Sequence, residues 1–184
     1  MGQSLPFTSE VTRSLPDRVR LAILLDKKFP LVTVLNGDKG WQQSGGATGE
    51  LSPERVQELR EEAYVWWLTT LVPLRQDPFT LTPLPDAKVG DQAAAVVRVS
   101  SPGHPDAKLF FDKRSGPLLK IERRASETGV LVDKEYLYAD FKEFDGVTLP
   151  TKESVLINGK KWTETTLSSC KFPREVDKDA FTRP

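Results

Sequence analysis

Alternating apolar and polar positions predict that most of this chain forms β-strands. In residues 18–26 every second position is apolar, which is the period of a strand with one buried face: Val19, Leu21, Ile23 and Leu25. Residues 30–36 form a second run rich in β-branched side chains, and Asn36-Gly37 supplies turn chemistry at its end. A short third segment begins at Trp41 and ends at Gly45-Gly46.

One segment instead has the three-and-four spacing of an amphipathic helix. Ser52 is a suitable N-cap, Pro53 fits the first helical position, and Glu54 complements the positive end of the helix dipole. The apolar positions form a single stripe: Val56, Leu59, Ala63, Trp66, Trp67 and Leu71. The charged positions lie mostly away from that stripe: Arg55, Glu58, Glu61 and Glu62. Pro73 is expected to end the helix near Val72.

After the helix the pattern is that of a meander. Residues 75–86 contain three prolines and are expected to cross in an extended, irregular form. Turn signals then recur about every 8 to 15 residues. The strands between them are predicted at 93–100, 107–111, 118–124, 130–141, 147–157 and 161–172. Asn158-Gly159 is the strongest hairpin signal. The whole chain is thus expected to hold about nine or ten strands and one principal helix.

An antiparallel sheet of this size must curl, and an amphipathic helix needs an apolar surface to cover. The expected fold is therefore α+β: a curled antiparallel sheet that forms a half-closed, or unclosed, β-barrel with one principal helix covering its concave face. The length of 184 residues suits a single domain over residues 1–184.

Composition excludes several classes of function. The 26 Lys and Arg residues balance the 26 Asp and Glu residues, so the net charge is zero and the basic surface of a nucleic-acid-binding protein is not expected. The longest apolar runs are too short to span a bilayer. No signal peptide pattern follows Met1. A single Cys and a single His exclude an internal disulfide and a His-rich zinc site.

Candidates for catalysis are few. His104 lies in a predicted turn and is interpreted as a solvated turn residue, while Cys170 is interpreted as a structural thiol in the last strand. Residues 36–40 form a β-turn sequence without the spacing of a phosphate-binding loop. Acidic residues cluster at one hairpin tip but are too few for a calcium site: Asp140, Glu143 and Asp145. No metal or cofactor is expected, and the chain is not expected to be an enzyme.

The aromatic residues allow two interpretations. Ordinary core packing is one, and a ligand cavity beneath the helix is the other, because small-molecule sites are concave and mostly apolar. Tyr136 and Tyr138 share a strand face with Val132, whereas Phe110 and Phe111 face opposite sides. A cavity would be lined by Leu21, Ile23, Trp66, Trp67, Leu71, Phe111, Tyr136 and Tyr138.

Several motifs occur in a familiar order: Pro-Asp-Arg-Val-Arg at 16–20, Asn-Gly-Asp-Lys-Gly-Trp at 36–41, Phe-Phe-Asp-Lys-Arg-Ser-Gly at 110–116, the stretch 138–147 with Leu149-Pro150, and Asp-Ala-Phe at 179–181 before Pro184. From about residue 5 to the C-terminus, this order resembles the LolA/LolB-like superfamily of bacterial envelope proteins. The resemblance is greatest to members described as outer-membrane lipoprotein-sorting proteins.

The resemblance implies an unclosed antiparallel barrel with helices over an apolar hollow, as in carriers that shield lipoprotein acyl chains in the periplasm. It therefore implies a non-catalytic protein of the periplasm or cell envelope that binds a lipid or acyl group, with lipid or lipoprotein acyl chains as its partners. The alternative is a structural or protein-interaction module of the envelope that binds another protein and no small molecule.

The sequence also departs from that family. Members usually begin with a helix and one or more strands that are not recognisable here, so Met1 is expected to mark a trimmed start. The carrier has an Arg, linked to lid closure, where Leu15 precedes Pro16, and neither Arg18 nor Arg20 is assigned that role. The last predicted strand has a polar face, which favours a smaller or more polar hollow: Glu164, Thr166, Ser168 and Cys170.

Overall fold

The computed structural model describes residues 5–184, which form two compact units. The first unit comprises the described residues up to Thr70 together with the C-terminal segment Pro173–Pro184, and the second comprises Leu71–Phe172. The trimmed start expected at Met1 lies outside the described residues. The single domain expected from the length stays a prediction.

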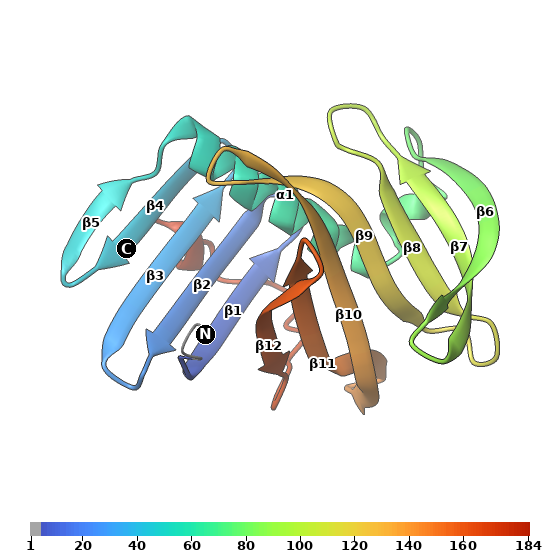
Figure 1. The fold of residues 1–184 in the computed structure, drawn as a ribbon. Coiled ribbons are helices and arrows are strands. Elements are labelled where there is room, and N and C mark those ends of the chain that lie inside the picture. Colours follow the sequence, from blue (N-terminus) through green and yellow to red (C-terminus); the bar gives the residue numbers. More distant parts are fainter. Residues whose placement is uncertain (1–4) are drawn as a thin grey trace. The chain divides into compact units, whose positions relative to one another are not determined.

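The first unit is a five-stranded antiparallel sheet with a helix across one face (Figure 1). Its strands follow one another in sequence order: β1 (Phe7–Ser14), β2 (Arg18–Leu25), β3 (Phe29–Asn36), β4 (Lys39–Ser44) and β5 (Ala47–Glu50). Each connection is a tight turn, and Gly37, Gly45 and Gly46 have the positive φ values that such turns require.

Helix α1 (Pro53–Thr69) begins as the sequence predicts. The Ser52 side chain accepts a hydrogen bond from the backbone N–H of Arg55 at 3.3 Å. The backbone N–H of Glu54, and then the Ser52 side chain, hold the pKa of the Glu54 carboxyl below its ordinary value. The predicted end was wrong, because Leu71 has a φ of +59° and so cannot continue the helix.

More of the α1 surface is buried than the predicted stripe covers. Three further side chains are buried: Tyr64, Val65 and Leu68. Glu58, which was expected on the polar side, is also buried, and Arg55 Nη1 lies 2.8 Å from its carboxylate. Consecutive helix residues are about 100° apart, so Glu58 lies away from Leu59 and beside Val65, on a second buried arc that the spacing rule did not predict.

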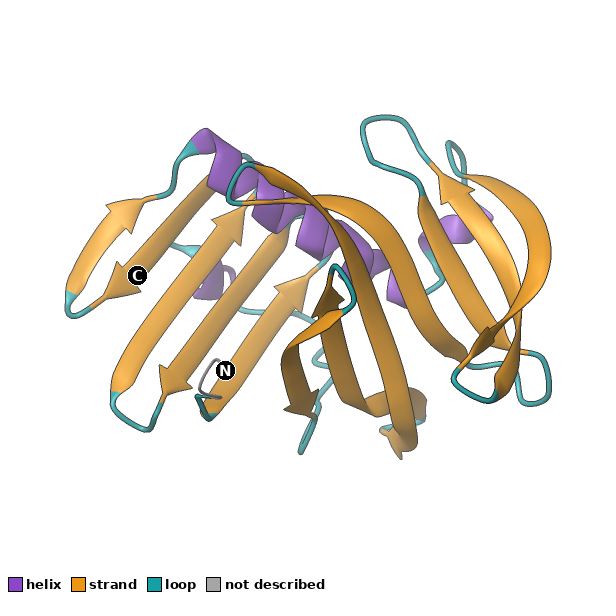
Figure 2. Cartoon of the chain, viewed as in Figure 1, coloured by secondary structure: helices purple, strands orange, loops and turns teal. Residues whose placement is uncertain are grey.

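The second unit is a seven-stranded antiparallel sheet, again without a crossover among the described strands. A short 3-10 helix, η1 (Pro73–Arg75), leads into it. Its order is β12-β11-β10-β9-β8-β7-β6, and the strands are β6 (Thr80–Val89), β7 (Gln92–Ser100), β8 (Ala107–Asp112), β9 (Leu118–Glu127), β10 (Val130–Phe144), β11 (Val147–Ile157) and β12 (Lys160–Thr166). Figure 2 shows how strongly strands dominate over helix in the chain.

The predicted class, a mostly antiparallel α+β protein with one principal helix, is confirmed, but three strands were missed. The sequences of β1 and β5 lack apolar alternation because both are mainly exposed edge strands. Segment 75–86 was expected to be irregular, yet β6 begins at Thr80. It tolerates its prolines because it is an edge strand whose register shifts between Leu84 and Ala87.

The last strand was predicted too long, since β12 ends at Thr166. Ser168 and Cys170 therefore do not extend its polar face, and Cys170 is a half-buried free thiol outside any strand. The Asn158-Gly159 hairpin is confirmed, with φ values of +49° and +72°.

The C-terminal segment completes the first unit. The 3-10 helix η2 (Lys178–Phe181) places the Phe181 ring 1% exposed, with the Arg18 guanidinium carbon 5.5 Å from its centroid. Asn36 Nδ2 donates to the Phe181 carbonyl at 3.2 Å, and Thr48 Oγ1 donates to the Pro184 carbonyl at 2.9 Å. Residues about 135–145 positions apart in sequence are thereby held together.

We expect Phe181→Ala to lower the free energy of unfolding by about 3–5 kcal/mol, because it removes a fully buried ring. Urea denaturation followed by circular dichroism measures this loss. Phe172→Ala is the matched control, since that ring is 47% exposed and its loss should cost less than about 0.5 kcal/mol. Equal losses in the two variants would contradict the anchoring role of Phe181.

Candidate functional site

The helix-facing side of the five-stranded sheet is organised in cross-strand rows, because directly paired residues point to the same face. Val19 pairs with Leu35, and Leu21 pairs with Thr33. The first row forms a core with two helix residues, Val56 and Ala63. Further apolar side chains pack against this core: Val11, Leu15, Leu51, Leu59 and Trp66.

Contacts at two places fix the position of α1 across this face. On β4, a Cβ at Gly40 would lie only 3.0 Å from Leu51 Cδ1 and 3.1 Å from Val56 Cγ2. On β1, the Arg13 guanidinium carbon lies 4.1 Å from the centroid of the Trp66 ring, a cation–π contact. The helix therefore crosses from β4 to β1 over the first two rows, as Figure 1 also shows.

The cavity found beneath the helix is small. A cavity of about 20 Å³ remains, lined by Val19, Leu21, Thr33, Leu35, Leu59 and Trp66. This is room for about one water molecule, and a lining of this composition favours an empty cavity. An acyl chain does not fit there while the helix keeps this position.

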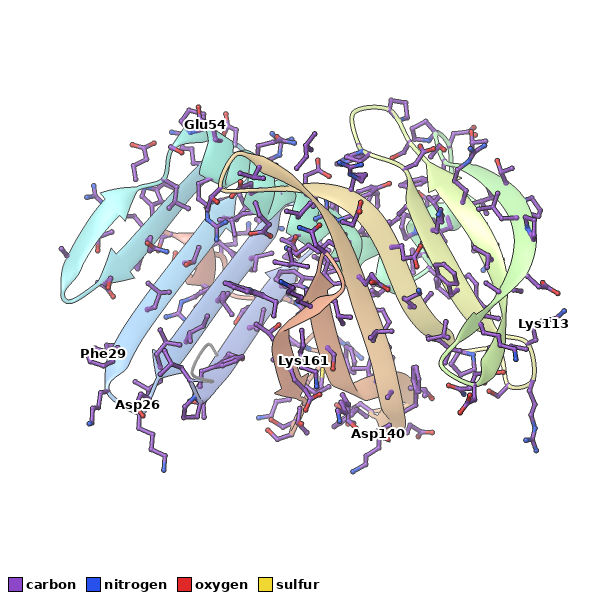
Figure 3. All side chains as sticks on the ribbon, in the orientation of Figure 1. Asp26, Phe29, Glu54, Lys113, Asp140 and Lys161 are labelled. Atoms are coloured by element: carbon purple, nitrogen blue, oxygen red, sulfur yellow. The ribbon has the colours of Figure 1, made fainter. Side chains whose placement is uncertain are left out.

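Two further rows on the same face lie outside the core under the helix. Ile23 pairs with Leu31, and Leu25 pairs with both Phe7 and Phe29. We call these five residues the apolar strip. Four of its side chains are half-buried and Phe29 is 64% exposed. The strip runs toward the β2–β3 turn, where Figure 3 labels Asp26 and Phe29. The strip therefore lies on the same sheet face as the helix core but outside it.

In the second unit, alternation places Val132, Lys134, Tyr136 and Tyr138 on one face of β10, and all four are buried. Leu109 lies on the same face, because it pairs with Ile121, which in turn pairs with Tyr136. Phe111 is two positions after Leu109 on β8 and therefore shares its face. Tyr136 and Tyr138 are therefore neighbours, as predicted.

Sequence reasoning missed two buried cations on this face. Arg123 and Lys134 are direct cross-strand partners and each is 6% exposed. Arg123 Nη2 donates to the Tyr136 hydroxyl at 3.3 Å, and Lys134 Nζ donates to the Glu127 carboxylate. The period-two pattern of β10 could have revealed the burial of Lys134, since this residue lies between Val132 and Tyr136 on the apolar face.

The predicted lining residues thus fall into separate groups. Leu21 and Trp66 meet at the small cavity, and Ile23 lies in the next row, within the apolar strip. Trp67 is half-buried on α1, while Leu71 is an exposed residue after it. Phe111, Tyr136 and Tyr138 belong to the second unit. That these residues line a ligand cavity stays a prediction.

The other chemical candidates have ordinary surroundings. His104 lies in the turn after β7, where its backbone N–H donates to the Ser101 carbonyl at 3.3 Å. A polar pocket of about 260 Å³ lies beside the start of α1, lined by charged residues of both signs. Within residues 5–184, no group of three or more His, Cys, Asp or Glu side chains could hold a metal ion. None of the described helices is long and apolar enough to cross a bilayer.

The comparisons with known proteins bear on the fold. No family model matches the chain, and no curated protein matches it. A domain from Vibrio parahaemolyticus, described as an outer membrane lipoprotein-sorting protein domain, is similar over 96% of this chain and 80% of its own length, with a TM-score of 0.56 and 14% identity. The chain has a LolA/LolB-like fold.

Two further solved structures are similar. A DUF1329 family protein from Desulfovibrio piger has a TM-score of 0.55 and 12% identity, over 97% of this chain and 81% of its own. A LolA superfamily protein from Nitrosomonas europaea is 12% identical over 97% of this chain and 88% of its own, but its TM-score of 0.45 is too low to support an argument. At these identities the likeness concerns the fold alone.

We expect Glu127→Gln to lower the free energy of unfolding by about 1–2 kcal/mol, because a buried ammonium loses a carboxylate acceptor. The same substitution in a Lys134→Met background should cost less than about 0.5 kcal/mol. Urea denaturation of the four proteins of this double-mutant cycle measures the coupling. Equal losses in the two backgrounds would show that Glu127 does not stabilise the Lys134 ammonium.

Proposed function

We propose that this protein is a non-catalytic protein of the bacterial periplasm or envelope that binds a lipid or acyl group on its apolar strip. The observation that carries the proposal is the strip itself: five large apolar side chains on one sheet face, outside the helix core. The LolA/LolB-like fold supports it, since the similar Vibrio domain is described as a lipoprotein-sorting domain.

Burial alone can supply the binding energy. Each methylene group removed from water contributes about 0.8 kcal/mol, and no directional contact is needed. The strip spans three neighbouring strands, which are about 4.8 Å apart, so it is roughly 10 Å wide. A hydrocarbon chain lying across the strands would run along this dimension and contact all three strands.

The closed end of the proposed site is the helix core. Leu21 and Trp66 border the strip there, and the cavity of about 20 Å³ behind them leaves no room for a chain to pass beneath α1. We propose that the acyl group stays on the strip unless the helix moves. Contact of the other predicted lining residues with a ligand stays a prediction: Trp67, Leu71, Phe111, Tyr136 and Tyr138.

A fluorescent fatty acid, 11-(dansylamino)undecanoic acid, tests the proposal. We expect its emission to rise and shift to the blue with the purified chain, because the dansyl group enters an apolar site. Ile23→Ser should weaken binding by about 1–2 kcal/mol, roughly 5- to 30-fold, because it removes one apolar contact from the strip.

Ala22→Ser is the matched control, because Ala22 lies on the same strand but on the opposite face and is also half-buried. Its affinity for the probe should equal that of the unmodified chain. No uptake by the unmodified chain, or equal loss in both variants, would refute the proposed site. A ligand-free dimer in native mass spectrometry would favour the protein-interaction alternative.

A further inference from the structure

Two hairpins in different units contain two adjacent lysines followed by an aromatic residue. Lys27 and Lys28 lie in the β2–β3 turn and precede Phe29, the first residue of β3, whereas Lys160, Lys161 and Trp162 begin β12 directly after the β11–β12 turn. In both, two adjacent lysines precede an aromatic residue that points into solvent: Phe29 is 64% exposed and Trp162 is 71% exposed. Both rings are among the exposed large hydrophobic side chains of the described residues. A single exposed aromatic residue is common on protein surfaces, but the same combination of two lysines and an exposed ring at two hairpin tips favours a shared binding role.

The first of these turns, the β2–β3 tip, is built under backbone constraint. Asp26 and Lys27 have φ values of +48° and +56°, and the Lys28 N–H donates to the Leu25 carbonyl at 3.0 Å. Glycine or asparagine is the usual residue at such positive φ. Lys27, an exposed residue, therefore occupies a position that glycine or asparagine adopts with less backbone strain.

Exposed apolar side chains surround the lysines of this tip. Leu24 precedes the turn and is exposed on the sheet face opposite Phe29. The Asp26 N–H donates to the Pro6 carbonyl at 2.8 Å, which holds the exposed Leu5 close to the turn. The tip thus combines two ammonium groups and the Asp26 carboxylate with three exposed apolar side chains, and its net charge is positive.

The second turn, the β11–β12 tip, has the same composition in a different geometry. Asn158-Gly159 makes a tight turn, and the strand register shifts between Val155 and Leu156, so that Trp162 has no cross-strand partner. Lys161 Nζ lies 2.8 Å from the Glu164 carboxylate in a solvent-exposed pair. Such pairs are weak and can exchange for another anion.

Other hairpin tips lack this combination. The β9–β10 tip exposes Val130 and Leu131 but carries no lysine. The β8–β9 tip carries Lys113 and Arg114 but no exposed aromatic side chain. Figure 3 labels Lys113 and Lys161, one on each kind of tip. These tips provide natural controls for the apolar and the cationic contributions separately.

We propose that the β2–β3 and β11–β12 tips bind the surface of a lipid bilayer that contains anionic lipids. The ammonium groups attract lipid phosphates, while the aromatic rings insert at the boundary between headgroups and acyl chains. Each lysine close to an anionic surface strengthens binding by about fivefold. Each tip is proposed to bind by itself. Apart from Phe29, neither tip includes a residue of the apolar strip, and the inference does not depend on acyl binding there.

Vesicle sedimentation tests the inference. We expect the full chain to bind vesicles that hold about three phosphatidylcholine molecules per phosphatidylglycerol, and to bind pure phosphatidylcholine vesicles at least roughly tenfold more weakly. High salt should weaken binding to the anionic vesicles, because it screens the lysines. Absence of binding to anionic vesicles would overturn the proposal and would favour an acidic protein as the partner of the tips. Equal binding to both vesicle compositions would also overturn it.

Variants of the tips separate specific from general effects. Lys27→Gln with Lys28→Gln should weaken binding by about 5- to 25-fold, as should Lys160→Gln with Lys161→Gln. Two matched controls should bind as the unmodified chain does: Lys113→Gln with Arg114→Gln for charge, and Val130→Ser with Leu131→Ser for apolarity. Equal loss in the controls would overturn the assignment to these two tips.

The fluorescence of Trp162 also indicates whether its ring enters the bilayer. The other three tryptophans are half-buried, so we expect a blue shift of emission on addition of anionic vesicles to come from Trp162 and to disappear in Trp162→Phe. A shift that persists in this variant would overturn insertion at the β11–β12 tip. Ile23→Ser should leave vesicle binding unchanged, so a failure of acyl binding and a failure of membrane binding give different results.

Discussion

The packing of α1 on the first two rows of the five-stranded sheet is the contact on which the candidate site depends. Val19 and Leu35 meet Val56 and Ala63 there, and the absence of a side chain at Gly40 lets the helix approach β4 closely. Because the helix covers only these rows, the apolar strip remains on the same face. The position of the helix therefore sets the extent of the strip. The strands continue beyond the rows that pack against the helix, and the strip lies on that remaining part.

The second unit buries charged side chains on a mostly apolar sheet face. Arg123 and Lys134 are buried beside each other between Ala107 and Ile157 of the same cross-strand row, and a phenol and a carboxylate accept their hydrogen bonds. Buried charges are tolerated only with such partners. An entirely apolar face would be a better surface for hydrocarbon. This polarity is one reason to assign the proposed acyl site to the first unit.

The fold of this protein does not by itself determine its function. The LolA/LolB-like fold accounts for the antiparallel sheets and the amphipathic helix, but sheets of this kind serve several purposes. The features that favour binding to hydrocarbon or to a membrane surface are local. They are the apolar strip and the two hairpin tips at which lysines precede an exposed ring. Turns are free to carry such residues because their side chains take no part in the core.

The sequence by itself determined the helix start, most of the strands and the sharing of a face by Tyr136 and Tyr138, because caps, turn pairs and period-two alternation are local signals. It could not reveal β1 or β6, since edge strands need little apolar alternation and tolerate proline. Nor could it show that Leu21 and Trp66 enclose only about 20 Å³, or that Phe181 anchors the C-terminal segment. Those facts depend on contacts between distant residues, and only the tertiary structure decides how completely side chains fill the space between elements.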